Sequence, residues 1–280
     1  MAAMPAREAV RLLDLAHEYG IRHFDTARMY GHGRTEALLG QMARGKRDSM
    51  VIVSKAGIEP PSRWGRAFAR VAPSLRAVAR LGEPRFGRFS PAAVEASVRK
   101  SLTELGADYL DALLLHEIEP AQMSDELAAL LQTMKRQGRI RAIGLATSAA
   151  HTLALQRSHE TLFDIVQIPC ASLIQTDISA FRPARVILHS VLGERLQAAF
   201  DQLDPEFAAK HGLAARPTSS EETRRQLAQL LMRTAIARNP GGVVLFASAK
   251  DAHIRLNASL TGAEEGVAND VERLIRSTAG

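Results

Sequence analysis

Short apolar or β-branched runs alternate along the chain with longer amphipathic stretches. The runs that predict strands are Arg22–Asp25, Met50–Ser54, Tyr109–Leu115, Ile140–Leu145, Phe163–Ile168, Arg185–Leu188 and Val243–Phe246. The amphipathic stretches that predict helices include Pro5–Tyr19, Thr35–Ala43, Pro91–Leu105, Asp125–Gln137 and Glu221–Arg238. Such alternation indicates parallel strands joined by helical crossovers.

Several predicted helices carry local start and stop signals. Ser90 precedes Pro91, which is the pattern of an N-cap followed by proline at the first helical position. Ser124 likewise precedes two acidic residues, and Gly106 and Gly138 stand where helices should end. Three stretches lack a regular pattern and are expected to be irregular connections: Ala56–Phe89, Ala171–Pro183 and Asp204–Pro217.

The predicted strands are apolar on both faces, as the segments DALLL and AIGLA illustrate. This is typical of strands covered by helices on one side and by a packed interior on the other. An open doubly wound sheet would give the same pattern, so the alternation alone does not choose between an open sheet and a barrel. No Pro/Gly/Ser-rich linker divides the chain, and we therefore predict one α/β domain over residues 1–280.

The predicted strands are one fewer than the eight of a complete TIM-type (β/α)8 barrel. Because the sequence opens with a helical pattern, we expect the absent strand to be the first. A seven-stranded barrel would leave unpaired strand edges, which are a liability for a folded protein. A misassigned start site would explain the same observation.

The composition is that of a globular protein in a reducing compartment. The 280 residues are 46% hydrophobic and 24% charged. Cys170 is the only cysteine, which excludes an intramolecular disulfide and a cysteine-rich zinc site. The first twenty residues lack the apolar core of a signal peptide, and no apolar run is long enough to span a bilayer. We therefore expect a cytoplasmic location and no membrane partner.

Positive charge is concentrated in one stretch of the sequence. The formal net charge is +6, and between Arg63 and Arg88 there are seven arginines and one acid, Glu83. A basic patch of this kind can bind nucleic acid, or it can be a solvated loop that attracts phosphate-bearing ligands. The stretch has few aromatic side chains on which bases could stack, so we do not expect nucleic acid to be the partner.

Polar, ionisable side chains stand at or just beyond the carboxyl ends of three successive predicted strands. Asp25 ends one strand and Tyr30 follows in a glycine-rich turn, Lys55 ends the next, and His116 ends the third. Each residue alone has an ordinary structural explanation, such as a turn former or a solvated cation. In a parallel barrel, however, these strand ends share one rim, where active sites are built. The four together predict a proton-transfer centre without a metal ion.

Six segments of the sequence resemble the aldo-keto reductase family in the order in which the family has them. They are GIRHFDTARMYGHGRTEALLG, VIVSKAG, SPAAVEASVRKSLTELGADYLDALLLHE, MKRQGRIRAIGLATS, FDIVQIP and ARNPGGVVLFASAKDAHIRLNASL. The resemblance implies a TIM-type barrel that transfers hydride between a nicotinamide cofactor and the carbonyl of an aldehyde, ketone or sugar. The glycine-rich dinucleotide fingerprint, the Walker loop and the HExxH motif are all lacking from the sequence.

The resemblance also implies roles for the four rim residues. Tyr30 would donate a proton to the carbonyl oxygen as hydride reaches the carbon. Free tyrosine has a pKa of about 10, so we expect Lys55 to bring the pKa of Tyr30 down toward the working range. Asp25 would keep Lys55 charged, and His116 would orient the substrate oxygen.

Further positions match the family's cofactor site. Thr147 and Gln167 match residues that contact the nicotinamide carboxamide, although the family more often has Ser-Asn where Ala146 and Thr147 stand. His189 occupies the place of the aromatic residue that stacks on the nicotinamide. The two residues that match positions near the pyrophosphate are Ser190 and Leu192.

The C-terminal motif resembles the adenosine end of that site. Ser248 and Asn257 match positions that face the adenosine phosphate and the adenine. The family's phosphate-binding lysine falls on Ala247 and its arginine on His253. Because Lys250 and Arg255 can replace these cations, we expect NADP, with NAD as the alternative.

The same residues permit a second function. A relative that has lost a strand could bind the nicotinamide cofactor as a non-catalytic scaffold or sensor. Cofactor binding without hydride transfer would distinguish this function from catalysis. The sequence specifies neither the physiological substrate nor the oligomeric state.

Overall fold

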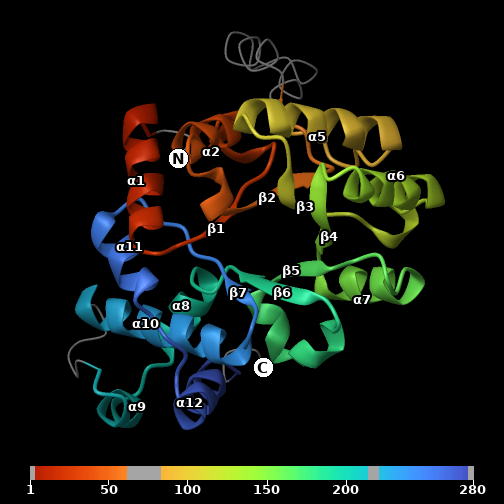
Figure 1. Ribbon diagram of the computed structural model, residues 1–280. Helices are drawn as coiled ribbons and strands as arrows, with labels where there is room; N and C mark the ends of the chain where they lie inside the picture. Colours follow the sequence, from red (N-terminus) through yellow and green to blue (C-terminus); the bar gives the residue numbers. More distant parts are fainter. Residues whose placement is uncertain (1–3, 62–82, 214–220, 277–280) are drawn as a thin grey trace, which may run out of the picture. The chain divides into compact units, whose positions relative to one another are not determined.

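The structure is a computed structural model that describes residues 4–61, 83–213 and 221–276 (Figure 1). These residues form two compact units. The first comprises Met1–Val166 with Ala249–Asp251, and the second comprises Gln167–Ser248 with Ala252–Gly280. The prediction of a single domain over residues 1–280 remains a prediction.

All seven predicted strands are confirmed, and they follow one another in the order of the chain. Their bounds are β1 (His23–Asp25), β2 (Val51–Ala56), β3 (Leu110–His116), β4 (Ile140–Ala146), β5 (Ile165–Pro169), β6 (Arg185–His189) and β7 (Val243–Val244). β1 and β2, β2 and β3, β3 and β4, and β6 and β7 all pair in parallel. Parallel strands linked by helices in this order are the topology of a TIM-type (β/α)8 barrel, here with seven strands in the described residues.

The predicted helices are also confirmed, within a few residues at their ends. The helices are α1 (Ala6–Glu18), α2 (Thr35–Ala43), α5 (Pro91–Leu105), α6 (Asp125–Arg136), α7 (Ala149–Ser158), α8 (Glu194–Asp201), α9 (Pro205–Lys210), α10 (Glu221–Arg238), α11 (Asp251–Ala258) and α12 (Glu265–Arg276). The prediction that Asp204–Pro217 is irregular is wrong at its start. Asp204 caps α9 by accepting a hydrogen bond from the Phe207 N–H at 2.7 Å, and Pro205 occupies the first turn.

The start and stop signals act as the sequence predicts. The Ser90 hydroxyl accepts a hydrogen bond from the Ala93 N–H, and the Ser124 hydroxyl accepts one from the Leu127 N–H. Gly106 ends α5 with a φ of 61°, and Gly138 follows α6 with a φ of 72°. This left-handed conformation favours glycine, which explains why these helices end where they do.

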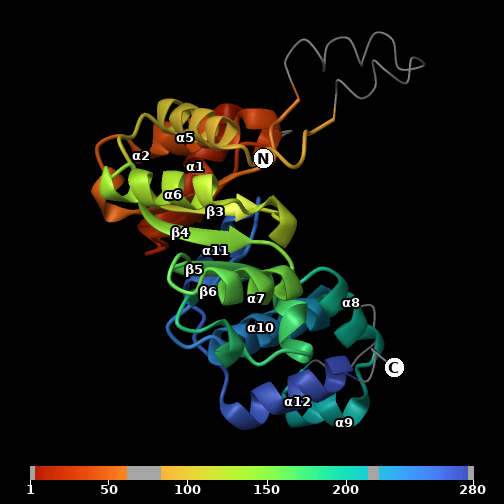
Figure 2. The same ribbon diagram turned by 90° about the vertical axis from the view of Figure 1, so that its right-hand side faces the viewer.

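In the first unit, helices cover one face of the sheet and small side chains fill the other. Figures 1 and 2 show α2, α5 and α6 on the same side of β1–β4, and α5 contacts β2 while α6 contacts β4. The opposite face carries a buried cluster whose members are Val53, Ala112, Leu114 and Ala146. Successive side chains along a strand point to opposite faces of the sheet, so residues two apart on the same strand share a face.

Gly40 allows α2 to approach the end of α5 closely. A Cβ atom at this position would lie 2.5 Å from the Leu105 carbonyl oxygen and 2.8 Å from the Glu104 carbonyl oxygen. Both atoms belong to backbone, which cannot move aside as a side chain can.

We therefore expect Gly40→Ala to destabilise the protein. Overpacking costs about 1–3 kcal/mol, which exceeds the roughly 1 kcal/mol that alanine gains over glycine in helix propensity. Urea denaturation followed by circular dichroism measures the change. Gly266→Ala is the matched control, since no described residue lies within 4 Å of a Cβ at that helical position. The stability of this control should equal or exceed that of the wild type. Equal stability of both variants would contradict the packing account.

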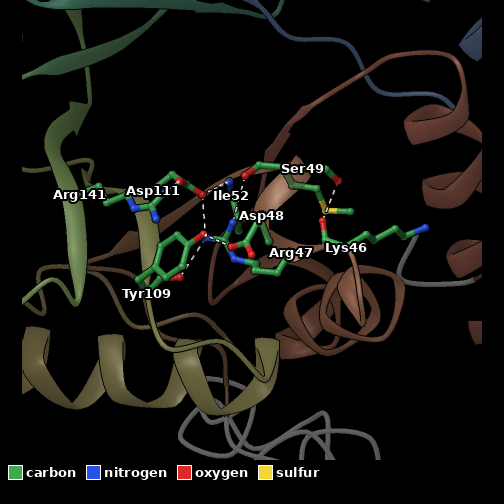
Figure 3. Close-up of polar contacts among 9 residues, drawn as sticks. Lys46, Arg47, Asp48, Ser49, Ile52, Tyr109, Asp111 and Arg141 are labelled. Carbon is green, nitrogen blue, oxygen red and sulfur yellow. Dashed lines mark hydrogen bonds and ion pairs between the residues drawn. The ribbon is translucent and has the colours of Figure 1, made fainter.

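A polar cluster joins the amino-terminal ends of β2, β3 and β4 (Figure 3). The Tyr109 ring lies between two guanidinium groups, with Arg47 4.0 Å and Arg141 3.7 Å from its centroid. Asp111 accepts hydrogen bonds from both arginines and from the Ile52 N–H. Polar side chains at this end of barrel strands contribute to stability, whereas the opposite end carries chemistry.

In the second unit, β6 and β7 pair through Ile187 with Val243 and Leu188 with Val244. α10 contacts β7, α8 and α12. The buried Asn239 side chain donates hydrogen bonds to the carbonyl oxygens of Val186 and Val243 at 3.1 and 3.0 Å. This amide fixes the end of α10 beside both strands.

Most of the basic stretch lies outside the described residues, including Arg63, Arg66, Arg70, Arg76 and Arg80. Its last part is described: Arg85 and Arg88 are exposed and lie 3.8 and 4.0 Å from the Glu59 carboxylate. The absence of a nucleic-acid partner therefore remains a prediction. No helix in the described ranges combines the length and apolarity that crossing a membrane requires.

Candidate active site

Strand register brings three of the four predicted catalytic side chains to one face of the sheet in the first unit. Asp25 pairs with Val53, Lys55 pairs with Leu114, and His116 pairs with Ala146. Residues paired in register share a face, and residues two apart on a strand do so as well. Asp25, Lys55 and His116 therefore lie on the face of the small-residue cluster, at the carboxyl ends of their strands.

Lys55 and Asp25 form a buried ion pair. The Lys55 ammonium donates a hydrogen bond to Asp25 Oδ1 at 2.5 Å and another to the Thr26 carbonyl oxygen at 3.0 Å. The Lys55 side chain is 1% exposed and that of Asp25 is 10% exposed. A charged lysine tolerates such burial only when it is paired, so the aspartate fixes both its charge and its direction.

Tyr30 completes the group from the turn that follows β1, where it begins the short 3-10 helix Tyr30–Gly33. The Lys55 nitrogen lies 4.9 Å from the centroid of the Tyr30 ring. The rings of Tyr30 and His116 are 6.1 Å apart at 89°, which is an edge-to-face arrangement. The structure thus brings together all four residues that the sequence predicts at the reaction centre.

The expectation that Lys55 lowers the pKa of Tyr30 is wrong in this structure. Burial raises the pKa of Tyr30 to about 12, and the negative charges of Asp25 and Glu117 add to the effect. A phenol with so high a pKa stays protonated at neutral pH, so Tyr30 carries a proton but is a weak acid in the protein without ligands.

Burial also lowers the pKa of Lys55, and Asp25 opposes this effect by its charge and its hydrogen bond. The charged groups near the lysine therefore decide whether it remains an ammonium ion. Glu36 of α2 is a further carboxylate that favours its charged form.

Thr147 carries a polar atom that lacks a hydrogen bond to the described residues. It follows β4 directly, is 4% exposed, and its buried hydroxyl oxygen has no hydrogen-bond partner in the part of the chain that the structure describes. Buried polar groups are normally hydrogen-bonded, so an unsatisfied hydroxyl calls for an explanation. A carboxamide group, such as that of nicotinamide, offers both a donor and an acceptor and fits this position.

Of the other predicted cofactor residues, Lys250 belongs to the first unit and the rest belong to the second. Gln167 is 4% exposed on β5. His189 ends β6, and its Nδ1 lies 2.9 Å from the hydroxyl of Ser190, whose φ is 54°. Leu192 lies between β6 and the start of α8. His189, Ser190 and Leu192 thus lie at or just beyond the carboxyl end of β6, as the barrel interpretation requires.

The residues predicted to face the adenosine lie just before α11 or within it. Ser248 is half-buried, Lys250 is exposed just before the helix, and Arg255 and Asn257 lie within it. Asp251 stands beside Lys250 and would repel a phosphate. The Arg11 guanidinium holds this carboxylate through two hydrogen bonds of 2.7 and 2.8 Å, which neutralises it.

Comparison with known proteins decides the family. The model of the aldo/keto reductase family matches residues 2–192. The chain belongs to this family. Two relatives are the aldo-keto reductase AFTS1 of Alternaria alternata, 30% identical over 159 residues, and the NADH-specific methylglyoxal reductase of Escherichia coli, 31% identical over 156 residues. These alignments cover 53% and 54% of this chain but only 42% and 44% of the relatives. The chain therefore spans less than half the length of these relatives.

A solved structure supports the fold over nearly the whole chain. The aldo-keto reductase from Klebsiella pneumoniae in complex with NADPH aligns with a TM-score of 0.69 at 23% identity. The alignment covers 98% of this chain and 88% of that protein. The TIM-type barrel class predicted for this aldo/keto reductase is thus confirmed.

Three buried residues next to the reaction centre received no role from the sequence. They are Arg28, Glu36 and Ser54, which are 4%, 0% and 0% exposed. Glu36 belongs to the TEALLG part of the aldo/keto reductase resemblance, and Arg28 lies within FDTARMYG. A charged residue on an otherwise apolar helix was the available signal, because acids are almost never fully buried unless paired.

Proposed function

We propose that this aldo/keto reductase reduces a small carbonyl compound with NADPH, and that Tyr30 is the proton donor. The observation that carries the proposal is the buried Asp25–Lys55 pair, with its ammonium 4.9 Å from the Tyr30 ring. Tyr30 and Lys55 lie at the carboxyl ends of parallel strands, where barrel enzymes bind substrates, and this position supports the proposal.

Each residue has a separate task in the proposed reaction. When bound, nicotinamide supplies the hydride. Tyr30 donates its phenolic proton to the carbonyl oxygen as negative charge develops there. Lys55 stabilises the phenolate that remains, and Asp25 keeps Lys55 charged and directed. His116 stands edge-on to the Tyr30 ring, from where it can orient the substrate oxygen by a hydrogen bond.

The proposed cofactor contacts run from the nicotinamide to the adenosine. The unsatisfied Thr147 hydroxyl supports a contact with the carboxamide, and Gln167 would provide a second one. His189 would stack on the ring, and Ser190 and Leu192 would lie near the pyrophosphate. Ser248 and Asn257 would contact the adenosine, where the exposed cations Lys250 and Arg255 favour NADP over NAD. A relative is NADH-specific by name, so this preference requires a direct test.

We expect this protein to bind NADPH more tightly than NADH. Titration of nicotinamide fluorescence measures both affinities. Lys250→Gln and Arg255→Gln should each weaken NADPH binding by about tenfold and leave NADH binding unchanged, because charge-assisted bonds to a phosphate are lost. Lys100→Gln, at an exposed position of α5, controls for the change of net charge. Equal affinity of the wild type for both cofactors would show that neither cation contacts the phosphate.

The test of the proposed activity is cofactor oxidation in the presence of a panel of aldehydes, ketones and sugars. The proposal expects NADPH consumption that depends on the carbonyl compound. Cofactor binding without consumption across the panel would instead favour the scaffold or sensor function.

A further inference from the structure

A second buried ion pair lies behind the reaction centre, and none of its members takes part in the proposed chemistry. The Arg28 guanidinium donates a hydrogen bond to Glu36 Oε2 at 2.8 Å, and the Ser54 hydroxyl donates one to Glu36 Oε1 at 2.7 Å. The side chains of Arg28 and Glu36 are 5% and 0% exposed. The two carboxylate oxygens of Glu36 therefore each bind a different segment of the chain.

Both segments carry a residue of the reaction centre. Arg28 lies two residues before Tyr30, in the turn between β1 and α2. Ser54 directly precedes Lys55 on β2 and, by alternation, faces away from the substrate side of the sheet. Glu36 of α2 thus links the turn that carries Tyr30 to the strand that carries Lys55.

The network also completes the electrostatic surroundings of Lys55. The groups that face the lysine are Asp25 of β1 at 2.5 Å, the Thr26 carbonyl oxygen at 3.0 Å and the Tyr30 ring. Glu36 acts on it from α2, and His116 of β3 contacts the same Tyr30 ring. Glu36 is the only carboxylate besides Asp25 among the described groups that favour the charged form of Lys55.

A contribution to the stability of the fold does not by itself explain the buried Arg28–Glu36 ion pair. Removing two charges from water costs free energy that their attraction barely repays, and apolar residues of similar volume are often equally stable or better. A buried ion pair can instead serve the reaction by holding two segments of the reaction centre at a fixed distance. A displacement of about 1 Å at a reaction centre can lower the rate on the order of 10²-fold.

We propose that Glu36 is a positioning residue that sets the placement of Tyr30 against Lys55 by binding Arg28 with one oxygen and Ser54 with the other. The inference rests on the proposed function for its effect on rate. Its effect on Lys55 itself is independent of turnover.

The decisive variant is Glu36→Gln, which keeps the size of the side chain and removes its charge. We expect kcat to fall by about tenfold with KM changed little, since the reacting groups are displaced and the substrate contacts remain. The titration of Lys55, followed by NMR of 13C-labelled lysine and assigned with Lys55→Met, should shift to lower pH. Ser54→Ala removes one hydrogen bond without a change of charge, so it should lower kcat less and leave the lysine titration in place.

A double variant separates positioning from stability. Arg28→Met with Glu36→Gln leaves no uncompensated buried charge and should fold at least as well as Glu36→Gln alone. It should nevertheless retain the low kcat and the shifted lysine titration. Wild-type kcat and wild-type lysine titration in Glu36→Gln or in the double variant would overturn the proposal. If neither of these folds, wild-type kcat in Ser54→Ala would overturn it. If the wild type transfers no hydride, the proposed function fails, and the lysine titration still decides whether Glu36 supports Lys55.

Discussion

Tyr30→Phe is expected to lower turnover by about 10²–10⁴-fold, which is the usual loss when a positioned acid is removed. The phenylalanine ring keeps the edge-to-face contact with His116 and lacks only the proton that the reaction needs. Cofactor affinity should therefore remain close to that of the wild type. Single-turnover measurements with preformed cofactor complex separate the chemical step from binding.

Tyr109→Phe provides the control for this substitution. Tyr109 lies at the opposite ends of the strands, where its hydroxyl donates a hydrogen bond to Asp48 at 3.1 Å (Figure 3). Loss of this hydroxyl should leave turnover unchanged. Near-full activity of Tyr30→Phe would remove tyrosine from the mechanism.

The second large effect is expected from Lys55→Met. This change leaves the Asp25 carboxylate buried without its cation, which costs about 3–5 kcal/mol of stability. It also removes the charge that stabilises the phenolate of Tyr30, so turnover should fall by about 10²–10³-fold. Urea denaturation and cofactor oxidation measure the two losses separately.

The double variant Lys55→Met with Asp25→Asn distinguishes the two causes. Removing both charges should restore most of the stability, because no unpaired carboxylate remains. Turnover should stay low, since the cation is still absent. Recovery of turnover together with stability would mean that Lys55 serves the fold and not the reaction.

The sequence predicts β2 and β3 well because most of their residues are buried on both faces and therefore form short, continuous apolar runs. Helix bounds were predicted where local signals act, as at Ser90 and Gly106, whose cap interactions the structure contains. α9 was missed because its six residues are too few to display a helical period.

The candidate catalytic group was predictable because parallel strands bring their carboxyl ends to one rim. The pKa values of this group and the ion pair behind it could not be predicted from the sequence. The pKa of Tyr30 depends on burial and on Asp25 and Glu117, and these effects arise only from the three-dimensional arrangement. The bridge through Glu36 depends likewise on which buried donors reach each of its oxygens, and sequence spacing does not specify this.

The most direct test of the central claim is hydride transfer itself. The protein is mixed with NADPH carrying deuterium at the transferable position of the nicotinamide and with an aldehyde that the panel identifies as a substrate, or with the panel as a whole. The account predicts an alcohol with one deuterium on the former carbonyl carbon, formed by the wild type and nearly abolished in Tyr30→Phe. Tight NADPH binding with no deuterium in any product would contradict it.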